Sequence, residues 1–350
     1  MDPAAGSVAG PIHVTILVWG MLQLARPGQA GACTAWGKLQ LARVFSHLPL
    51  GDLNRMPTGC KLALPLCLLG LLGACSKTER LLVVGSKASI EQVFLAEVAA
   101  GHLERKLGIK VARKYNWGET MAVHTGLVGG EIDLYPEYGC IALPVMLRAQ
   151  MDTDRNSMLE RLRDEYASGF RALWLDPLGF DGRCQVAVRR SDAAKFKITK
   201  MSDLGRRKEG WRVGVTREFR ARKDGFPLLD ATYHITLRTP PLAMEPAMFP
   251  RALTEDTIDL ILAGATDIVW ASDDLRILQD DAQVFPPCEM SFVLRSDADQ
   301  AYPGVRRTLA ELSGKFTLEV MRAANIKLSD GRVAVESVAE GFRREAGLLR

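Results

Sequence analysis

The sequence has little of what marks the common enzyme families. Its 350 residues include only five histidines, which are scattered, and no G-x-S-x-G, H-E-x-x-H or P-loop pattern. Those patterns would supply an activated serine, a zinc site or a phosphate-binding loop. We therefore expect a protein that is not an enzyme and that uses no cofactor and no metal. The rival view, that it is an enzyme, would require turnover of a bound ligand.

An excess of charge of one sign is also missing. The formal net charge is only +4, and the basic residues form neither a stripe nor a nucleic-acid module. We expect no nucleic-acid partner. With 47% hydrophobic and 25% charged residues the chain is globular in composition, and its length is sufficient for two lobes with their own cores.

No hydrophobic run is long enough to be a convincing membrane span. Residues 13–24 are apolar but short, and Gly20 interrupts them. Residues 62–72 have the length of the apolar core of a signal peptide, and Lys61 supplies the short basic segment before it. Residues 1–55 are uninformative: they are either an over-long predicted start, or a poorly ordered extension.

A lipidation signal follows the second apolar run. Leu72-Gly73-Ala74-Cys75 matches the lipobox of bacterial lipoproteins, in which small residues precede the acylated cysteine. We expect translation to begin at Met56, residues 56–74 to be removed as a signal peptide, and residues 75–80 to form a tether behind the lipidated Cys75. The mature protein would be periplasmic or otherwise extracytoplasmic and anchored to a membrane.

Cysteine is sparse in the remaining chain, and its spacing is unusual for a metal site. There is no C-x-x-C, and only Cys140, Cys184 and Cys288 follow the lipobox. An odd number of cysteines in an oxidising compartment leaves at least one outside an internal disulfide. They could be three small buried thiols, two of them could form a disulfide, or all three could bind a soft metal.

The chain is organised around residues 81–143. Residues 81–84 form an apolar run typical of a buried strand, and a turn through Lys87 follows it. Ser89 and Gln92 have the spacing of a capping box, which predicts a helix beginning there. Free N–H groups at this helix start, together with Lys87, favour binding of a carboxylate or another anion.

The second half of this stretch repeats the arrangement. Thr120 can cap a helix that Gly129-Gly130 would end, and residues 132–135 read as a short strand stopped by Pro136. Glu137 and Tyr138 then project from the carboxyl end of that strand. In open α/β sheets, ligands bind outside these strand ends.

Further strands and helices alternate along the rest of the chain. A polar helix is expected over residues 151–169, strands over 185–188, 211–215 and 257–263, a return crossing at 285–294, and helices towards the C-terminus. Thr266 lies at the end of the third of these strands. The pattern predicts an α/β protein with two lobes joined by two crossover strands. Lobe 1 would comprise residues 81–184 plus 289–350, and lobe 2 residues 185–288.

Several motifs, in order, resemble a known family. They are GSKASIEQ from Gly85, GGEIDLYPEY ending at Tyr138, WLDPLGF from Trp174, EFRARKDG from Glu218 and VFPP from Val284. Together they are similar to the substrate-binding proteins of osmoprotectant ABC importers, the glycine betaine, choline and proline betaine family. The resemblance covers residues 81–349 and implies a periplasmic-binding-protein fold of the type II-like class.

The resemblance also implies roles for individual residues. Lys87 and Arg222 match the residues that hold the ligand carboxylate, and Tyr138 matches the first ring of an aromatic cage around a trimethylammonium group. The other cage positions fall on Cys184, Gly264 and Cys288, none of which is aromatic.

A carboxylate could replace the missing rings. Glu289 or Glu137 would suit a ligand whose cationic end carries N–H groups, so an amino-acid-like or a soft-metal ligand is the alternative to the betaine-like osmolyte that the resemblance implies. The resemblance implies a monomer that passes a small zwitterionic ligand to an ABC permease and its ATPase. The same binding lobes could instead serve in sensing.

Overall fold

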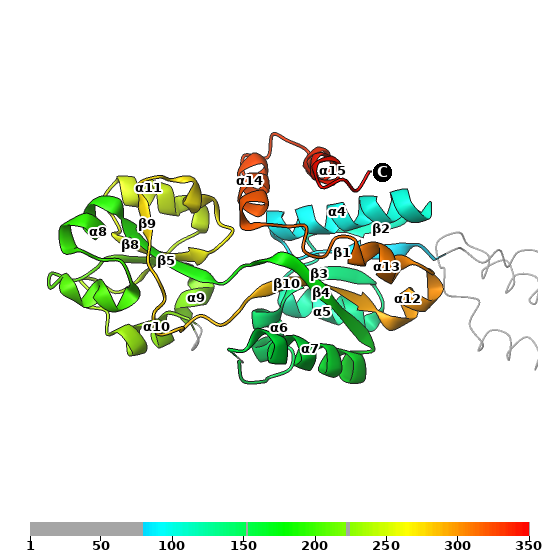
Figure 1. The fold of residues 1–350 in the computed structure, drawn as a ribbon, viewed down its shortest axis with the longest axis horizontal. Helices are drawn as coiled ribbons and strands as arrows, with labels where there is room; N and C mark the ends of the chain where they lie inside the picture. The colour runs from blue at the N-terminus through cyan, green and yellow to red at the C-terminus, as the bar shows by residue number, and fades with distance from the viewer. Residues whose placement is uncertain (1–79, 152, 222–224, 350) are drawn as a thin grey trace, which may run out of the picture. The chain divides into compact units, whose positions relative to one another are not determined.

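The computed structural model describes residues 80–151, 153–221 and 225–349. Within these ranges the chain forms two five-stranded sheets, each covered by helices on both faces (Figure 1). The bilobal α/β architecture predicted from the sequence is thus confirmed.

The first sheet has the strand order β2-β1-β3-β10-β4. Its strands are β1 (Leu82–Gly85), β2 (Val111–Lys114), β3 (Leu134–Tyr138), β4 (Ala172–Asp181) and β10 (Glu289–Arg295). Strand β1 runs parallel to both β2 and β3, whereas β10 is antiparallel to β3 and β4. The carboxyl ends of β1 and β3 therefore meet at one edge of the sheet, where Lys87 and Glu137 lie.

Two layers of helices cover the first sheet. One face packs against α4 (Ile90–Leu107), α13 (Val305–Ala310), α14 (Leu318–Leu328) and α15 (Val335–Glu345). The other face packs against α5 (Thr120–Gly129), α6 (Gly139–Val145) and α7 (Arg155–Phe170). The short helix α12 (Ser296–Ala301) follows β10. Strand β1 is buried along almost all of its length, which is why it reads as a continuous apolar run.

The second sheet has the order β7-β6-β8-β5-β9. Its strands are β5 (Cys184–Arg189), β6 (Val213–Val215), β7 (Leu242–Ala243), β8 (Leu260–Gly264) and β9 (Leu275–Ile277). The covering helices are α8 (Arg190–Phe196), α9 (Arg217–Ala221), α10 (Phe226–Tyr233) and α11 (Phe249–Thr254), with short 3-10 turns at Met201–Arg206, Pro246–Met248 and Ile268–Ala271. Separate apolar clusters lie on its two faces.

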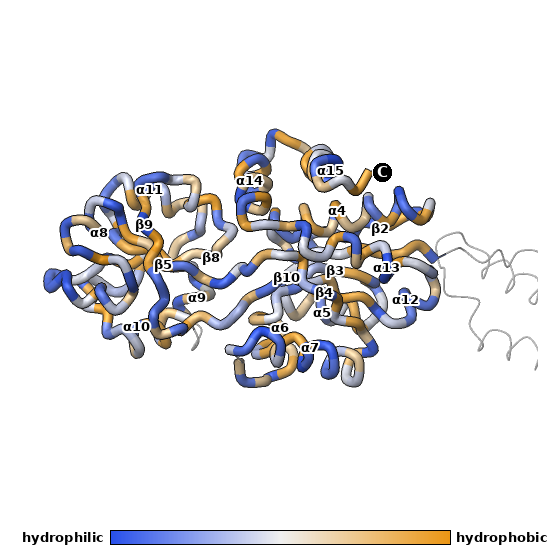
Figure 2. Tube along the Cα trace, in the orientation of Figure 1, coloured by the Kyte–Doolittle hydropathy of each residue, from blue (hydrophilic) through white to orange (hydrophobic). Residues whose placement is uncertain are grey.

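The chain passes between the sheets twice. It leaves the first sheet from β4 through Gly182 into β5, and it returns from β9 into β10 (Figure 1). The two crossing segments touch, because the Gly182 amide donates to the carbonyl oxygen of Cys288 over 2.8 Å. The tube view shows apolar residues concentrated along the strands and polar residues along the outer helices (Figure 2).

The local signals around the strand ends were partly right. Ser89 is the N-cap of α4, and its hydroxyl accepts from the Gln92 amide, as predicted. Gly130 ends α5 in the left-handed conformation, also as predicted. Thr120 is not the cap, however: Glu119 holds that position, and Thr120 is the first helical residue.

The prediction that Pro136 stops a strand was wrong. Strand β3 runs through it, and Pro136 pairs with Phe292 of β10. On its other side β3 pairs with β1 at Leu134 alone, so no ladder there needs the N–H that proline lacks. In the part of the chain that the structure describes, no helix is both long and apolar enough to cross a membrane.

Candidate functional site

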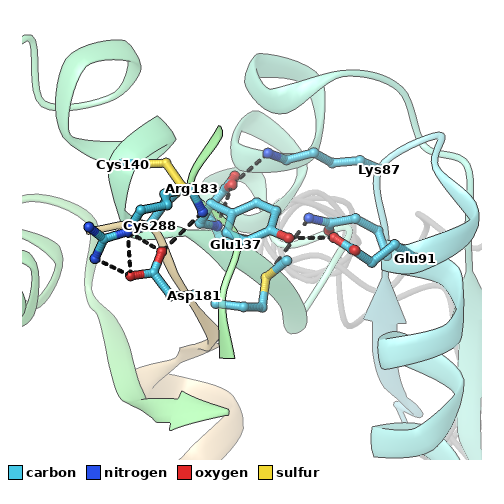
Figure 3. The surroundings of a disulfide bond; sticks show 10 residues. Lys87, Glu91, Glu137, Cys140, Asp181, Arg183 and Cys288 are labelled. Atoms are coloured by element: carbon cyan, nitrogen blue, oxygen red, sulfur yellow. Dashed lines mark hydrogen bonds and ion pairs between the residues drawn. A yellow bond between two sulfur atoms is a disulfide. The ribbon is translucent and has the colours of Figure 1, made fainter. Parts of the chain in front are cut away.

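Lys87 and Glu137 form a buried ion pair at the strand ends. Lys87 lies in the turn after β1 and Glu137 near the end of β3, and their Nζ and Oε1 atoms are 2.5 Å apart (Figure 3). The side chains are 11% and 0% exposed. Lys87 is therefore not a solvated surface cation, and any anion that it binds must share it with Glu137.

Glu137 is only partly satisfied by this pairing. Its Oε1 atom also accepts from the Tyr138 amide over 2.8 Å, while Oε2 is buried with no hydrogen-bond partner among the described residues. Burial raises the pKa of Glu137, and the ion pair with Lys87 opposes that rise. Oε1 thus binds both Lys87 and the Tyr138 amide, whereas Oε2 can still accept a hydrogen bond.

Tyr138 sits where β3 ends, close to the crossing from β4. Its ring meets Phe180 edge-on at 6.2 Å, and it packs against Gly182 so closely that a Cβ added there would lie 2.4 Å from a ring atom. Residue 182 must therefore be glycine. The Tyr138 hydroxyl donates to Glu91 Oε1 over 2.6 Å. Burial raises the pKa of Tyr138 well above its usual value, and Glu91 adds to that effect.

The loop after β8 brings residues of the second sheet to the same place. Thr266 is buried and hydrogen-bonds Tyr138, which weakens the rise in the tyrosine pKa. Asp267 Oδ2 accepts from the Gly264 amide over 2.8 Å. Burial raises the pKa of Asp267 to about 6, and the negative charge of Glu91 contributes.

Helix α14 holds this loop through two polar side chains. Arg322 Nε donates to the Ala265 carbonyl over 2.7 Å, and Asn325 Nδ2 donates to the Thr266 carbonyl over 2.9 Å. The same amide nitrogen lies 3.3 Å from Glu91 Oε2. Glu91 of the first lobe and the 264–267 loop of the second are thus joined through Asn325.

A disulfide bond lies beside these groups. It joins Cys140, at the start of α6, to Cys288, just before β10, with a Cα–Cα distance of 4.8 Å (Figure 3). Of the alternatives left open by the sequence, the disulfide is the one observed. The three-thiolate metal site is wrong, because two of its ligands are consumed. Within the described ranges no cluster of His, Cys, Asp or Glu could hold a metal ion.

Glu289 is engaged by a different set of charges. Arg155 Nη1 lies 3.3 Å from its carboxylate, and Arg155 also approaches Asp181, which is bound in turn by Arg183. Asp181 further accepts from the Cys288 amide over 3.1 Å, which ties this network to the disulfide. Burial raises the pKa of Glu289, although Arg155 opposes the shift.

The structure gathers several predicted site residues and leaves others apart. Lys87, Glu137, Tyr138 and Thr266 lie in one connected group. Cys184 pairs with Gly264 across β5 and β8, next to the crossing. Glu289 belongs to the neighbouring arginine network. Arg222 and Cys75 lie outside the described residues, as do the signal peptide and the tether up to residue 79.

Three residues of the group had not been singled out from the sequence as site residues. Glu91 follows Ser89 in the GSKASIEQ motif and could have been noticed as an acid in the first turn of α4. Asp267 follows Thr266 directly, at the end of a predicted strand. Asn325 had no signal at all, because it comes from a helix 234 residues further along the chain than Glu91.

Two hollows on the described surface lie elsewhere. One is lined by residues of α7, β4 and α13, among them Trp174, and the other by residues of α5 with Trp117. Neither includes Lys87, Glu137 or Tyr138. The chemistry of the strand ends, rather than these hollows, defines the candidate site.

Comparison with known families gives one clear match. Residues 80–345 match the substrate-binding domain of the ABC-type glycine betaine transport system.

Characterised relatives are similar at the sequence level. The chain is 29% identical over 271 residues to the ergothioneine transport permease and binding protein EgtU of Helicobacter pylori, which covers 77% of this chain but only about half (48%) of that protein. It is 25% identical to the carnitine transport binding protein OpuCC of Listeria monocytogenes, covering 78% of this chain and 88% of the relative.

Solved structures show the same fold. A glycine betaine/carnitine/choline ABC transporter structure superposes with a TM-score of 0.69 at 22% identity, covering 77% of this chain and 100% of the other. Apo YehZ of Escherichia coli superposes with a TM-score of 0.63 at 23% identity, covering 77% of this chain and 99% of that one. These neighbours are bilobal periplasmic binding proteins.

Proposed function

Because the chain belongs to the family of substrate-binding domains of ABC-type glycine betaine transport systems, we propose that it captures a small zwitterionic carboxylate outside the cytoplasm and delivers it to an ABC permease. The family is one of transport binding proteins, which are extracytoplasmic and work with a permease. The observation that carries the proposal is the buried group formed by Lys87, Glu137 and Tyr138 at adjacent strand ends, contacted by Thr266 from the other lobe.

The carboxylate end of the ligand would bind Lys87. This cation is held by the turn after β1 and is nearly buried, so its charge is weakly screened. Glu137 accepts a proton more readily than a solvent-exposed glutamate, because burial raises its pKa. Protonation of Glu137 would weaken its ion pair with Lys87, which leaves the Lys87 ammonium group able to bind an incoming anion. Arg222, which follows α9, would grip the same carboxylate from the second lobe.

The cationic end would meet a reduced aromatic surface. Tyr138 supplies one ring, whereas the positions of the other family rings carry Cys184, Gly264 and Cys288. Losing several cation–π contacts at about 0.5–2 kcal/mol each turns micromolar binding into millimolar. Glycine betaine and choline should therefore bind weakly. The ligands named for the relatives, carnitine and ergothioneine, belong in the same screen.

A ligand screen with two clamp variants tests the proposal. Glycine betaine, choline, carnitine, ergothioneine and amino acids are added to residues 81–350 in a thermal-shift assay, where a ligand at 100 Kd adds about 2.7 kcal/mol. Lys87→Ala and Arg222→Ala should each weaken binding of the best ligand by about 1.5–3 kcal/mol in calorimetry.

The control addresses the loss of a buried partner. Lys87→Ala alone leaves Glu137 uncompensated, which can unfold the protein. The double variant Lys87→Ala/Glu137→Gln removes both charges and should fold but still bind weakly. Full affinity in this double variant and in Arg222→Ala would show that the clamp is wrongly assigned.

The proposal also includes a lipid anchor at Cys75, a monomeric state, and no enzymatic or nucleic-acid function. The lipid anchor is supported by the lipobox-like segment Leu72-Gly73-Ala74-Cys75. Cys75→Ala should abolish acylation and leave unprocessed precursor. Detection of residues 1–74 in the mature protein by mass spectrometry would refute the anchor without touching the binding function.

A further inference from the structure

We propose that Glu91 and Asp267 form the cation-recognising end of this site, and that they select a ligand whose cationic nitrogen carries N–H donors, such as a primary or secondary ammonium or a guanidinium group. This inference rests on the proposed function and narrows its ligand class. It also replaces Glu289 and Glu137 as the carboxylates that read the cation.

The two carboxylates come from opposite lobes. Glu91 lies in the first turn of α4, in the first lobe, and Asp267 follows β8 in the second. They are close enough for the charge of Glu91 to raise the pKa of Asp267. Asn325 connects the two sides, because it hydrogen-bonds both Glu91 and the Thr266 carbonyl.

Neither carboxylate has a cationic partner among the described residues. Glu91 accepts hydrogen bonds from Tyr138 and Asn325, and Asp267 accepts from the Gly264 amide. By contrast, Glu137 is paired with Lys87 and Glu289 with Arg155. A cation entering this part of the protein therefore meets two acids whose charge no described side chain neutralises.

Two buried amide oxygens close to Glu91 lack a hydrogen-bond donor among the described residues. Asn325 is 6% exposed, and its Oδ1 has no partner among the described residues, although its own amide nitrogen touches Glu91. Gln92, next to Glu91, is 3% exposed and its Oε1 is likewise unpartnered. Buried acceptors without donors are costly, so a ligand that supplies donors gains stability here.

This imbalance discriminates between classes of cation. A quaternary ammonium group has no N–H and cannot satisfy either orphaned oxygen. An ammonium or guanidinium group can donate to the carboxylates and to the amide oxygens together. Because Glu91 and Asp267 have like charges and belong to different lobes, a cation between them also offsets their repulsion and favours contact between the lobes.

A graded ligand series tests the proposal. Glycine betaine, dimethylglycine, sarcosine and glycine share one carboxylate and carry zero, one, two and three N–H groups on the nitrogen, and guanidinoacetate extends the series. Titration calorimetry on residues 81–350 should give affinities for sarcosine or guanidinoacetate at least tenfold higher than for glycine betaine.

Two isosteric variants locate the effect. Glu91→Gln and Asp267→Asn should each reduce that preference at least tenfold, while Glu340→Gln, which removes an exposed acid from α15, should leave it unchanged. The preference is a ratio measured within one protein, so a smaller folded fraction does not alter it. If one variant fails to fold, the other decides.

The outcomes separate this inference from the function on which it rests. Tighter binding of glycine betaine than of every N–H donor, dependent on Lys87, would overturn the inference and keep the proposed function. An equal loss of affinity for all ligands in both variants would also overturn it. The change in net charge near the site would then explain the effect, without any selection for N–H donors. No binding of any zwitterion in the series or the screen would overturn both.

Discussion

The charge state of Asp267 responds to mild acid. Burial raises its pKa from 3.8 to about 6, with a further contribution from Glu91 on α4, and Tyr138 and Arg322 are other titratable groups nearby. Between pH 4 and 6 the folded chain therefore holds a proton that the unfolded chain has released. By linkage, this group favours folding most below pH 4, and that contribution is lost as the pH rises through 6.

Removing the titrating group should flatten this dependence. From pH 4 to pH 7, the free energy of unfolding of Asp267→Asn should fall by about 1–3 kcal/mol less than that of the unchanged protein. Urea denaturation at both pH values measures the difference. Parallel pH profiles for the two proteins would show that Asp267 ionises normally in the fold.

Single residues of the site were predictable where they follow a strand directly. Lys87 and Tyr138 could be singled out because the carboxyl ends of apolar runs are readable in the sequence. The partnership of Lys87 with Glu137 was not, since both had been considered as ligand contacts rather than as partners of each other. Asn325 could not be found, because its place beside Glu91 results from how α14 packs on α4, and no local pattern encodes that.

At the scale of elements, the start of α4 positions the site. Ser89 caps the helix through the Gln92 amide, and the turn before it carries Lys87. Ser89→Ala should lower the free energy of unfolding by about 1 kcal/mol, whereas Ser89→Gly should cost only a few tenths. Chemical denaturation of the two variants provides the measurement, and equal losses would mean that the hydroxyl is not the stabilising group.

Elements were predictable where the local signal and the tertiary environment agree. The Ser89 cap and the Gly130 stop are decided within one helical turn, so the sequence indicates them correctly. The extent of β3 is decided by its neighbour instead. Pairing with β10 carries the strand through Pro136 to Tyr138, against the usual preference of proline.

For the whole molecule, the disulfide is the main covalent constraint on the described fold. It joins residues separated by 148 positions, and such a long closed loop restricts the unfolded chain strongly. Cys140→Ser/Cys288→Ser should lower the free energy of unfolding by about 2–5 kcal/mol. Guanidinium denaturation gives the value, and Cys184→Ser, outside the disulfide, should have a smaller effect. An unchanged midpoint after reduction would contradict the prediction.

The overall architecture was predictable because strands and helices alternate along the chain and two crossover strands could be placed between the lobes. The choice among the three cysteines was not, because pairing depends on distances that only the folded crossing segments establish. Cys288 lies against Gly182 of the other crossing, and Cys140 reaches it from the start of α6.

The position of this bond has a consequence for damaged molecules. Every strand of the second sheet lies between Cys140 and Cys288 in the sequence. The enclosed segment is thus a ring, with a tail on either side. A protease that cuts the ring once opens it, but the disulfide still joins the two fragments. They should therefore run as one band in a non-reducing denaturing gel and separate only when a reductant is added. The cut molecule therefore keeps its two sheets covalently joined through the Cys140–Cys288 bond.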